Sequence, residues 1–154
     1  MKFAAFSDTH DNVEAIRDLV REIKKEKFDI LFHAGDVISP FALREFSGLD
    51  NLHIAFGNND GDRQKLIEIA LQNGWKIADV ITFKNIAVYH GTTKEILDLL
   101  SKKFEIVIYG HTHEAVIKRD GERTLVNPGE VCGYLTGRRS YAVYEDGEFS
   151  IVEL

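Results

Sequence analysis

Carboxylate, amide and imidazole side chains follow five short apolar segments of the chain. Asp8 and His10 come after FAAF, Asp36 comes after ILFHAG, and Asn58 comes after HIAFG. Side chains of these types are ligands of divalent cations in proteins. With the histidines that follow IAVY and IVIYG, the candidate metal ligands are Asp8, His10, Asp36, Asn58, His90, His111 and His113.

The number of candidate ligands predicts a centre with two metal ions. Four ligands complete one structural zinc site, whereas seven imply two ions with positions left open for water. Residues two apart in an extended segment point the same way. Asp8 with His10, and His111 with His113, could therefore each hold one ion.

Such a centre would be cationic within a protein whose formal net charge is -6. Two divalent ions bring four positive charges, and Asp8 and Asp36 return two negative ones. The positive remainder suits a phosphate ester. A water held by both ions would have its pKa lowered from about 15.7 toward neutrality. We expect that water to attack phosphorus in line with the leaving oxygen.

The apolar segments that precede these ligands are predicted strands. Short β-rich runs lie at residues 2–6, 30–34, 52–56, 86–90 and 106–109. Apolar residues recur at helical spacing between them, at residues 13–23, 66–71 and 96–104. This alternation is typical of βαβ units and a mainly parallel sheet. Because the carboxyl ends of parallel strands share one edge, the candidate ligands should converge there.

The last third of the chain has a different pattern, in which strands follow one another without helices. From Glu114 onward, turn pairs Asp120-Gly121 and Asp146-Gly147 separate runs that read as strands. Asp-Gly suits the positive φ angles of tight hairpins. We expect an antiparallel tail that extends or faces the first sheet. No linker or repeat divides the chain, so we predict one domain over residues 1–154.

Composition and charge exclude several classes of protein. The 154 residues are 44% hydrophobic and 29% charged, as in globular proteins. The net charge argues against a surface built for a polyanion. The lone Cys132 cannot form an intrachain disulfide and excludes a cysteine-based zinc site. No signal peptide or membrane span is predicted, so we expect a cytoplasmic protein.

Each candidate ligand also has a structural interpretation when it is taken alone. Asp8 could precede a helix, Asp36 could open the following turn, and Asn58 could supply a left-handed turn. Only the joint occurrence after successive strands favours a metal centre. His33 and His53 precede or open apolar stretches, and we interpret both as structural.

The motifs D-x-H, G-D, G-N-x-D, H-G and G-H-T-H, in this order, resemble those of the calcineurin-like metallophosphoesterase family. The resemblance covers the whole chain and is closest to the small single-domain YfcE-type phosphodiesterases, which share the N-P-G turn at residues 127–129. It implies a four-layer αββα sandwich and a metal-dependent phosphodiesterase.

The resemblance also implies how the seven ligands are divided between two divalent ions. Asp36 would bridge them. One ion would be held by Asp8, His10 and His113, and the other by Asn58, His90 and His111. Oxygen and imidazole ligands suit Mn²⁺, Fe²⁺, Co²⁺, Ni²⁺ and Zn²⁺ alike. We expect Mn²⁺ on family grounds.

The chain departs from many relatives at Asn59, where they carry histidine in the G-N-x-D motif. An amide can donate a hydrogen bond to a phosphate oxygen, but it cannot deliver a proton to a leaving group. A missing general acid costs about 10²–10⁴ in rate. We therefore assign Asn59 a catalytic contact with the phosphate and predict a preference for diesters with good leaving groups over alkyl monoesters.

Neighbouring departures carry weaker expectations. Asp60 would lack the histidine that it steadies in relatives, and we expect it to cap the following helix together with Asp62. Glu130 replaces a small residue after N-P-G and is assigned no role. Arg138 and Arg139 could approach a phosphate, but a basic pair in a glycine-flanked loop favours a surface position.

The sequence leaves some alternatives to hydrolysis of a small phosphodiester open and disfavours others. A phosphomonoesterase or nucleotidase remains an alternative, as does a protein-interaction scaffold like the retromer subunit of this fold, although all seven ligands are present. Dinucleotide and P-loop motifs are absent, which disfavours nucleotide-binding folds. Without a basic groove lined by aromatics, nucleic acid is a poor candidate for a partner. Homo-oligomerisation is retained as an expectation.

Overall fold

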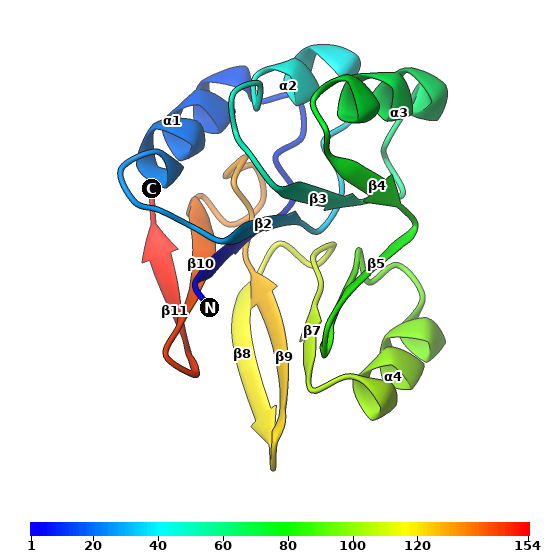
Figure 1. Cartoon of the computed structure of the whole chain (residues 1–154), viewed down its shortest axis with the longest axis vertical. Coiled ribbons are helices and arrows are strands. Elements are labelled where there is room, and N and C mark those ends of the chain that lie inside the picture. The colour runs from blue at the N-terminus through cyan, green and yellow to red at the C-terminus, as the bar shows by residue number, and fades with distance from the viewer.

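A computed structural model describes residues 1–154 and places two β-sheets face to face between layers of helices (Figure 1). The first sheet has six strands, in the spatial order β11 (Glu148–Glu153), β10 (Ser140–Glu145), β1 (Phe3–Phe6), β2 (Ile30–His33), β3 (Leu52–Ala55) and β4 (Lys76–Ala78). The second has five, in the order β5 (Val80–Phe83), β6 (Ile86–Tyr89), β7 (Ile106–Ile108), β9 (Arg123–Pro128) and β8 (Ala115–Asp120).

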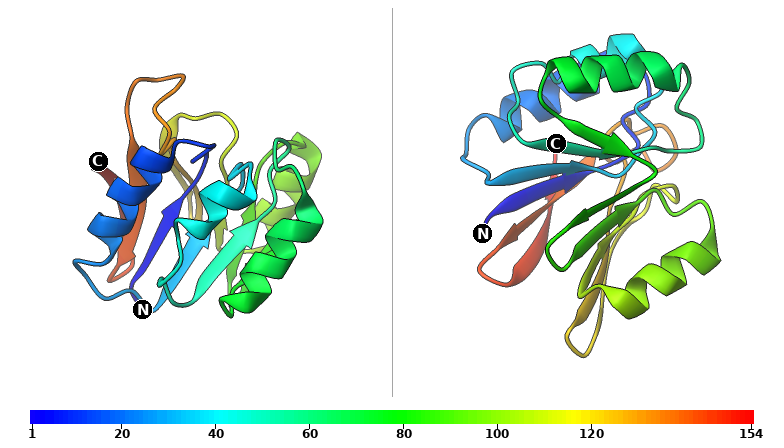
Figure 2. Two further views of the ribbon diagram at one scale, coloured as in Figure 1. Left: turned by 90° about the horizontal axis from the view of Figure 1, so that it is seen from above. Right: turned by 45° about the vertical axis from the view of Figure 1, so that its right-hand side comes forward.

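Helices cover the outer face of each sheet, as the two views of Figure 2 show. Three lie on the first sheet: α1 (Val13–Ile23), α2 (Pro40–Arg44) and α3 (Arg63–Gln72). The fourth, α4 (Lys94–Lys103), lies on the second. The α/β class and the four-layer αββα arrangement implied by the sequence motifs are therefore confirmed.

The central strands are continuously apolar because both of their faces are buried. In β1, Phe3 and Ala5 join the apolar cluster between the sheets, whereas Ala4 and Phe6 join the cluster beneath α1 to α3. Parallel strands covered on both faces have this composition. The helix on the second sheet is less firmly packed, since none of its residues is fully buried.

The five predicted strands are present, but they do not form a single sheet. β1, β2 and β3 pair in parallel in the first sheet, whereas β6 and β7 pair in parallel in the second. The expectation of one parallel sheet is wrong in this respect, because an apolar run does not specify which sheet it joins. The edge strands β4 and β5 and the short α2 were not predicted.

The strand-only tail divides between the two sheets. The hairpin of β10 and β11 extends the first sheet through β1, and the hairpin of β8 and β9 extends the second through β7. One hairpin turns at Asp146 and Gly147, as expected. The other turns one residue later than predicted, between the paired residues Asp120 and Arg123.

Helix starts follow the capping residues of the sequence. The Asn12 side chain accepts from Ala15 N and begins α1, and Ser39 caps α2 before Pro40. The Asp62 side chain accepts from Lys65 N at 3.2 Å and caps α3. Asp60 does not take part in that cap. The expectation that Asp60 and Asp62 cap the helix together is therefore wrong for Asp60.

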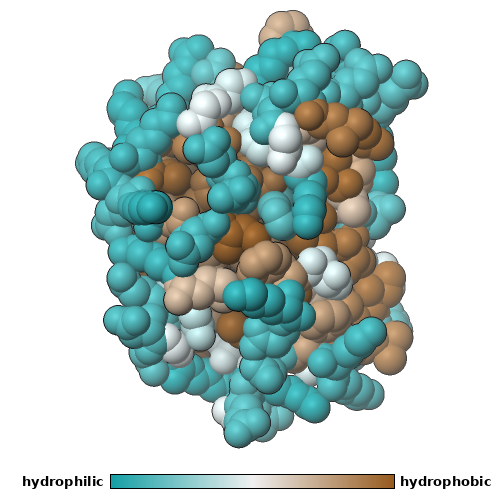
Figure 3. Space-filling model, viewed as in Figure 1, coloured by the Kyte–Doolittle hydropathy of each residue, from teal (hydrophilic) through white to brown (hydrophobic).

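The surface beside α3 has an exposed apolar groove, which lies on the right-hand side of Figure 3. Its volume is about 430 Å³, and it runs along the edge strands β4 and β5. The apolar lining residues are Ile67, Leu71, Trp75, Ile77, Ala78, Val80 and Ile81.

Among the helices, none is long and apolar enough to cross a membrane.

Candidate metal centre

The loops that follow β1, β2, β3, β6 and β7 meet at one edge of the sandwich. Asp8 N donates to Gly35 O at 3.0 Å, and His10 N donates to Asp36 O at 2.8 Å, which joins the first two loops. His111, which follows β7 of the second sheet, donates from its backbone N to Asp8 Oδ2 at 3.1 Å. Asp8 follows β1, so this bond links the two sheets. Both sheets therefore contribute side chains to one site.

Asp36 lies centrally among the candidate ligands. Its Oδ2 atom is 3.4 Å from His90 Nε2 and 3.7 Å from His10 Nε2. Asn59 donates to the same carboxylate from its backbone N at 2.9 Å and from Nδ2 at 2.8 Å. Burial alone would raise the pKa of Asp36, but the nearby His90 ring and the two donors of Asn59 outweigh it and hold that pKa well below its ordinary range.

Asp8 is fully buried and lies next to His10 and His113. Its Oδ1 atom lies 3.4 Å from His113 Nε2 and 4.0 Å from His10 Nε2. Burial raises the pKa of this carboxyl group. The ring centroids of His10 and His113 are 5.2 Å apart, and those of His90 and His111 are 5.1 Å apart. The rings therefore lie in the two pairs that the family resemblance implies. The spacing argument grouped His111 with His113 instead, but it assumed extended segments, whereas both residues have positive φ.

Asn58 is the candidate ligand with the fewest contacts. It is exposed and directly precedes Asn59, and its side chain has no hydrogen bond to the other candidates. Six of the seven candidates are thus held together by distances or ring contacts, and Asn58 adjoins them through its neighbour. The side chain of Asn59 faces Asp36 rather than solvent alone, and its Nδ2 keeps one further N–H to donate.

Five of the seven candidates have a left-handed backbone, with positive φ at Asp8, His10, Asp36, His111 and His113. Residues other than glycine rarely adopt this conformation, which costs about 1–3 kcal/mol and clusters at functional sites. The loops thus hold strain at the positions that carry the ligands.

Two glycines make room for the carboxylates. A Cβ atom at Gly57 would lie 2.1 Å from Asp36 Oδ1, and one at Gly110 would lie 2.6 Å from Asp8 Oδ2. Gly57 and Gly110 therefore let the backbone approach the ligand carboxylates closely.

The unpaired polar atoms of the site fit a divalent metal. Asp8 Oδ1, His10 Nε2 and His90 Nε2 are buried and have no hydrogen-bond partner. Such atoms are costly unless something satisfies them. Ligand atoms bound at about 2.1 Å to one ion lie about 3–4 Å apart, and the separations among these carboxylate and imidazole atoms run from 3.4 to 4.0 Å.

Two of the histidines are oriented by acceptors behind them. His90 Nδ1 lies 2.7 Å from Ala34 O, and His113 Nδ1 lies 2.5 Å from Glu130 Oε2. A carbonyl or carboxylate oxygen can only accept, so Nδ1 is the donor in both rings. The lone pair of Nε2 is then free to face Asp36 in one case and Asp8 in the other.

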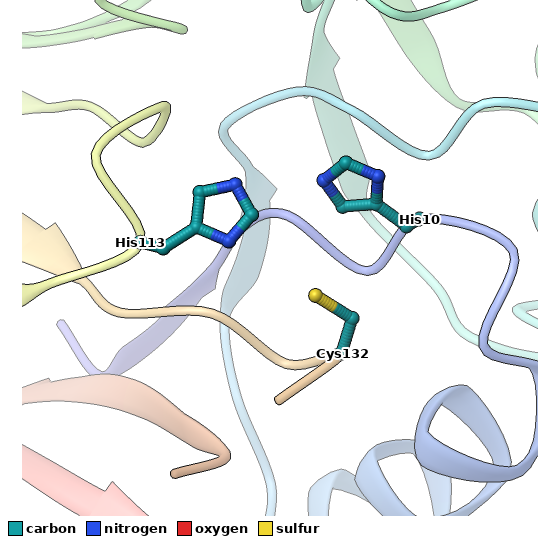
Figure 4. Close-up of side chains that lie close together, drawn as sticks. All are labelled: His10, His113 and Cys132. Atoms are coloured by element: carbon teal, nitrogen blue, oxygen red, sulfur yellow. The ribbon is translucent and has the colours of Figure 1, made fainter. Parts of the chain in front are cut away.

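Glu130 and Cys132 adjoin the site without being indicated by the sequence motifs. The Cys132 sulfur lies within 4.8 Å of ring nitrogens of His10 and His113, and all three side chains point into one space (Figure 4). The lone cysteine therefore adjoins the site, a position that the sequence does not indicate. Its thiol donates to Glu130, and burial raises its pKa to about 12. The only sequence feature that could have indicated Glu130 is its departure from the small residue that the family carries after N-P-G.

His33 and His53 are structural, as interpreted from the sequence. His33 is fully buried, lies 2.9 Å from Thr9 Oγ1 through Nε2, and accepts from Gly35 N through Nδ1. Burial lowers its pKa to about 3, so it stays neutral while it links two loops of the site. His53 packs edge-on against Phe32 and Phe83.

The two arginines after the last loop differ. Arg139 donates to Asp18 on α1 at 2.5 Å and so links the last loop to that helix. Arg138 is exposed and lines a pocket of about 420 Å³ that His113 also lines. The structure gives neither arginine a contact with the candidate metal ligands.

Residues 1–147 match the model of the calcineurin-like phosphoesterase superfamily domain. The chain belongs to this superfamily. Phosphodiesterase MJ0936 of Methanocaldococcus jannaschii is 37% identical to it over 146 residues, which cover 89% of this chain and 88% of that protein. The family inferred from the strand-end motifs is confirmed.

Solved structures of a phosphodiesterase and of a phosphoesterase have the same fold. An archaeal phosphodiesterase matches with a TM-score of 0.93 and 34% identity over 100% of both chains. YfcE, a phosphoesterase from E. coli, matches with a TM-score of 0.77 and 19% identity over 99% of this chain and 92% of its own. The second likeness concerns the fold alone.

Proposed function

We propose that this phosphoesterase is a phosphodiesterase that depends on a centre of two divalent metal ions. The observation that carries the proposal is the set of buried, unpartnered ligand atoms on Asp8, His10 and His90. The similarity to a phosphodiesterase at 37% identity supports the type of ester.

The proposed ligands divide by their observed neighbours. Asp8, His10 and His113 would hold one ion and Asp36 would lie between the two, because its Oδ2 faces both His10 and His90. The second ion would be held by Asn58, His90 and His111. When bound, such ions lower the pKa of water and neutralise phosphate charge.

Asn59 would bind the substrate rather than transfer a proton. One N–H of its Nδ2 donates to Asp36, and the second could donate to a phosphate oxygen. Because no imidazole stands at this position, the leaving group would have to depart without a proton from this residue. Esters with good leaving groups are therefore the expected substrates.

Hydrolysis of an aryl phosphodiester by the metal-stripped protein tests this function. Mn²⁺ is the expected activator, and Ni²⁺, Co²⁺, Fe²⁺ and Zn²⁺ are compared with it. Activity should appear on addition of metal and disappear with chelator. Asp36→Ala should abolish activity, whereas Asp120→Ala, at the exposed tip of a hairpin, should not. Absence of hydrolysis with every metal, or activity unaffected by Asp36→Ala, would favour an interaction scaffold.

Several expectations are proposed alongside this function. Residues 1–154 would act as one cytoplasmic domain on a small phosphodiester, without a nucleic-acid or membrane partner. Homo-oligomerisation stays a prediction. Sedimentation velocity over a range of protein concentrations tests it, since a monomer at all concentrations would contradict it.

A further inference from the structure

Glu130 is a fully buried carboxylate directly behind the candidate ligand His113. We propose that Glu130 is a positioning residue that fixes the His113 ring for metal binding and strengthens the ion site of Asp8, His10 and His113. The inference rests on the proposed metal-dependent function. It concerns a residue to which the sequence motifs assign no role.

The carboxylate is surrounded by donors, which is what a charge in the interior requires. Oε2 lies 2.5 Å from His113 Nδ1 and accepts from the Cys132 thiol at 3.2 Å. Oε1 accepts from Thr136 N at 2.6 Å, from Thr136 Oγ1 at 2.8 Å and from Leu135 N at 3.0 Å. Of these partners, only His113 is a candidate ligand.

The contact with Glu130 decides which nitrogen of His113 is free. Nδ1 donates to the carboxylate, so Nε2 carries the lone pair, and it lies 3.4 Å from Asp8 Oδ1. A rotated ring or the other tautomer would turn a hydrogen toward the site. Glu130 thus sets both the orientation and the tautomer of the ring.

The two sides of the centre differ in this support. Behind His90 stands a neutral carbonyl, Ala34 O at 2.7 Å, whereas behind His113 stands a carboxylate. A carboxylate partner makes the imidazole a better electron donor to a metal. We therefore expect the ion beside His113 to be the more tightly held of the two.

Glu130 also closes a loop, and this second role has to be separated from the first. Its bonds to the backbone N–H groups of Leu135 and Thr136 hold the segment that brings Tyr134 to 6.0 Å from His10, between ring centroids. A purely structural Glu130 would affect loop stability without changing the affinity for metal.

Calorimetric titration of metal-stripped protein with Mn²⁺ distinguishes these roles. Glu130→Gln keeps the shape of the side chain and removes its charge. Loss of a partner behind a ligand costs about 10–100-fold in metal affinity, and we expect a loss of this size at one of the two sites. Glu114→Gln is the matched control, because Glu114 is exposed next to His113 and has no bond to its ring. Affinity equal to the control's would overturn the inference.

A double-mutant cycle tests whether the effect passes through His113. In a His113→Ala background, Glu130→Gln should cause no further loss of Mn²⁺ affinity. A further loss as large as in the wild type would refute positioning of this ring. If the wild type itself binds no Mn²⁺, the proposed function fails; if it binds and Glu130→Gln binds equally well, only the inference about Glu130 fails.

Nitrogen NMR of the wild-type histidines answers the question even if Glu130→Gln does not fold. Labelled metal-free protein, with His113 assigned through His113→Gln, should show Nδ1 protonated and Nε2 bare in that ring. A ring protonated at Nε2 with Nδ1 bare would overturn the proposal.

Discussion

Asp36 faces His90 across 3.4 Å, and the two residues come from different sheets. Asp36 follows β2 of the first sheet, and His90 follows β6 of the second. The His90 ring is held from behind by Ala34 O, also beyond β2. The candidate centre is therefore a junction of the two sheets, and its geometry depends on how they pack.

Gly57→Ala should disable the centre without adding a charge or a polar group. The new Cβ would lie 2.1 Å from Asp36 Oδ1 and 2.4 Å from Asp36 N, so the carboxylate would have to move. A displacement of about 1 Å can cost about 100-fold in rate. We expect losses of this order in aryl diesterase activity, together with weaker Mn²⁺ binding by calorimetry.

Gly61→Ala is the control for that substitution. It lies in the same loop, and its nearest atom would be Ile38 O at 3.7 Å, an ordinary contact. Activity within about twofold of wild type is expected. Equal losses in the two variants would show that the loop, rather than the displaced carboxylate, limits activity.

Divalent metal should stabilise the folded protein. The unpartnered atoms Asp8 Oδ1, His10 Nε2 and His90 Nε2 are brought together only in the folded state. A ligand at 100 times its dissociation constant adds about 2.7 kcal/mol of stability. Thermal unfolding should therefore move to higher temperature with added Mn²⁺. Asp36→Ala should show little of this increase, and an equal increase in that variant would contradict binding at this site.

Much of this site could be predicted because its ligands follow buried strands, whose apolar runs are the clearest signal in the sequence. The pairing of His10 with His113 and of His90 with His111 was implied by the family resemblance, whereas spacing alone grouped His111 with His113. The division of the strands between two sheets could not be predicted from local pattern, because β6 is as apolar as β1.

Other features depend on contacts between residues that are distant in the chain. The left-handed backbone of Asp8 and His111 is imposed by the surrounding loops, since neither residue type requires it. Glu130 and His113 are separated by 17 residues, so their contact is visible only in the folded chain. Asp60 has the residue type of a helix cap, but its carboxylate bonds to Ile38 N and Gly57 N, and Ile38 is distant in the chain.

Asp60→Asn should destabilise the protein through the backbone of two loops. Its carboxylate accepts from Ile38 N and Gly57 N at 2.7 Å each and from Asp36 N at 3.3 Å. An amide keeps one acceptor and turns an N–H₂ group toward the remaining donors. Hydrogen bonds to charged groups contribute about 1.5–3 kcal/mol each, so we expect a loss of about 2 kcal/mol in urea unfolding.

The same substitution two residues along the chain controls for loss of charge. Asp62 caps α3, and asparagine caps a helix about as well as aspartate. Asp62→Asn should leave the free energy of unfolding nearly unchanged. A loss as large as that of Asp60→Asn would mean that charge in this loop, rather than the bonds of Asp60, is responsible.

Stability of the metal-free protein should fall on acidification because of His33. Burial lowers the pKa of His33 to about 3 from its ordinary 6.5. Between these values the unfolded chain binds a proton that the folded chain does not, so stability rises with pH across this window by up to about 1.4 kcal/mol per unit. It is lost as the pH falls from 6.5 toward 3.

Comparison with His33→Gln isolates this effect from that of other groups. Glutamine keeps a donor and an acceptor for Thr9 and Gly35 but does not titrate. The variant should be less stable at neutral pH, and its pH dependence between 4 and 6 should be shallower by about one proton. Parallel pH profiles for the two proteins would contradict the assignment to His33.

Asn59→His should shift the enzyme toward phosphomonoesters, because an imidazole can protonate an alkoxide leaving group and an amide cannot. General acids contribute about 10²–10⁴ in rate. We expect a smaller gain, about tenfold, in the ratio of alkyl monoesterase to aryl diesterase activity. Asp60 is bonded to Gly57 N and Ile38 N and is not free to orient the new ring. Asn59→Ala also removes the side-chain bond to Asp36 but adds no acid, so its ratio should stay at the wild-type value. An unchanged ratio in Asn59→His, or an equal rise in both variants, would contradict the proposal that the amide sets a preference for diesters.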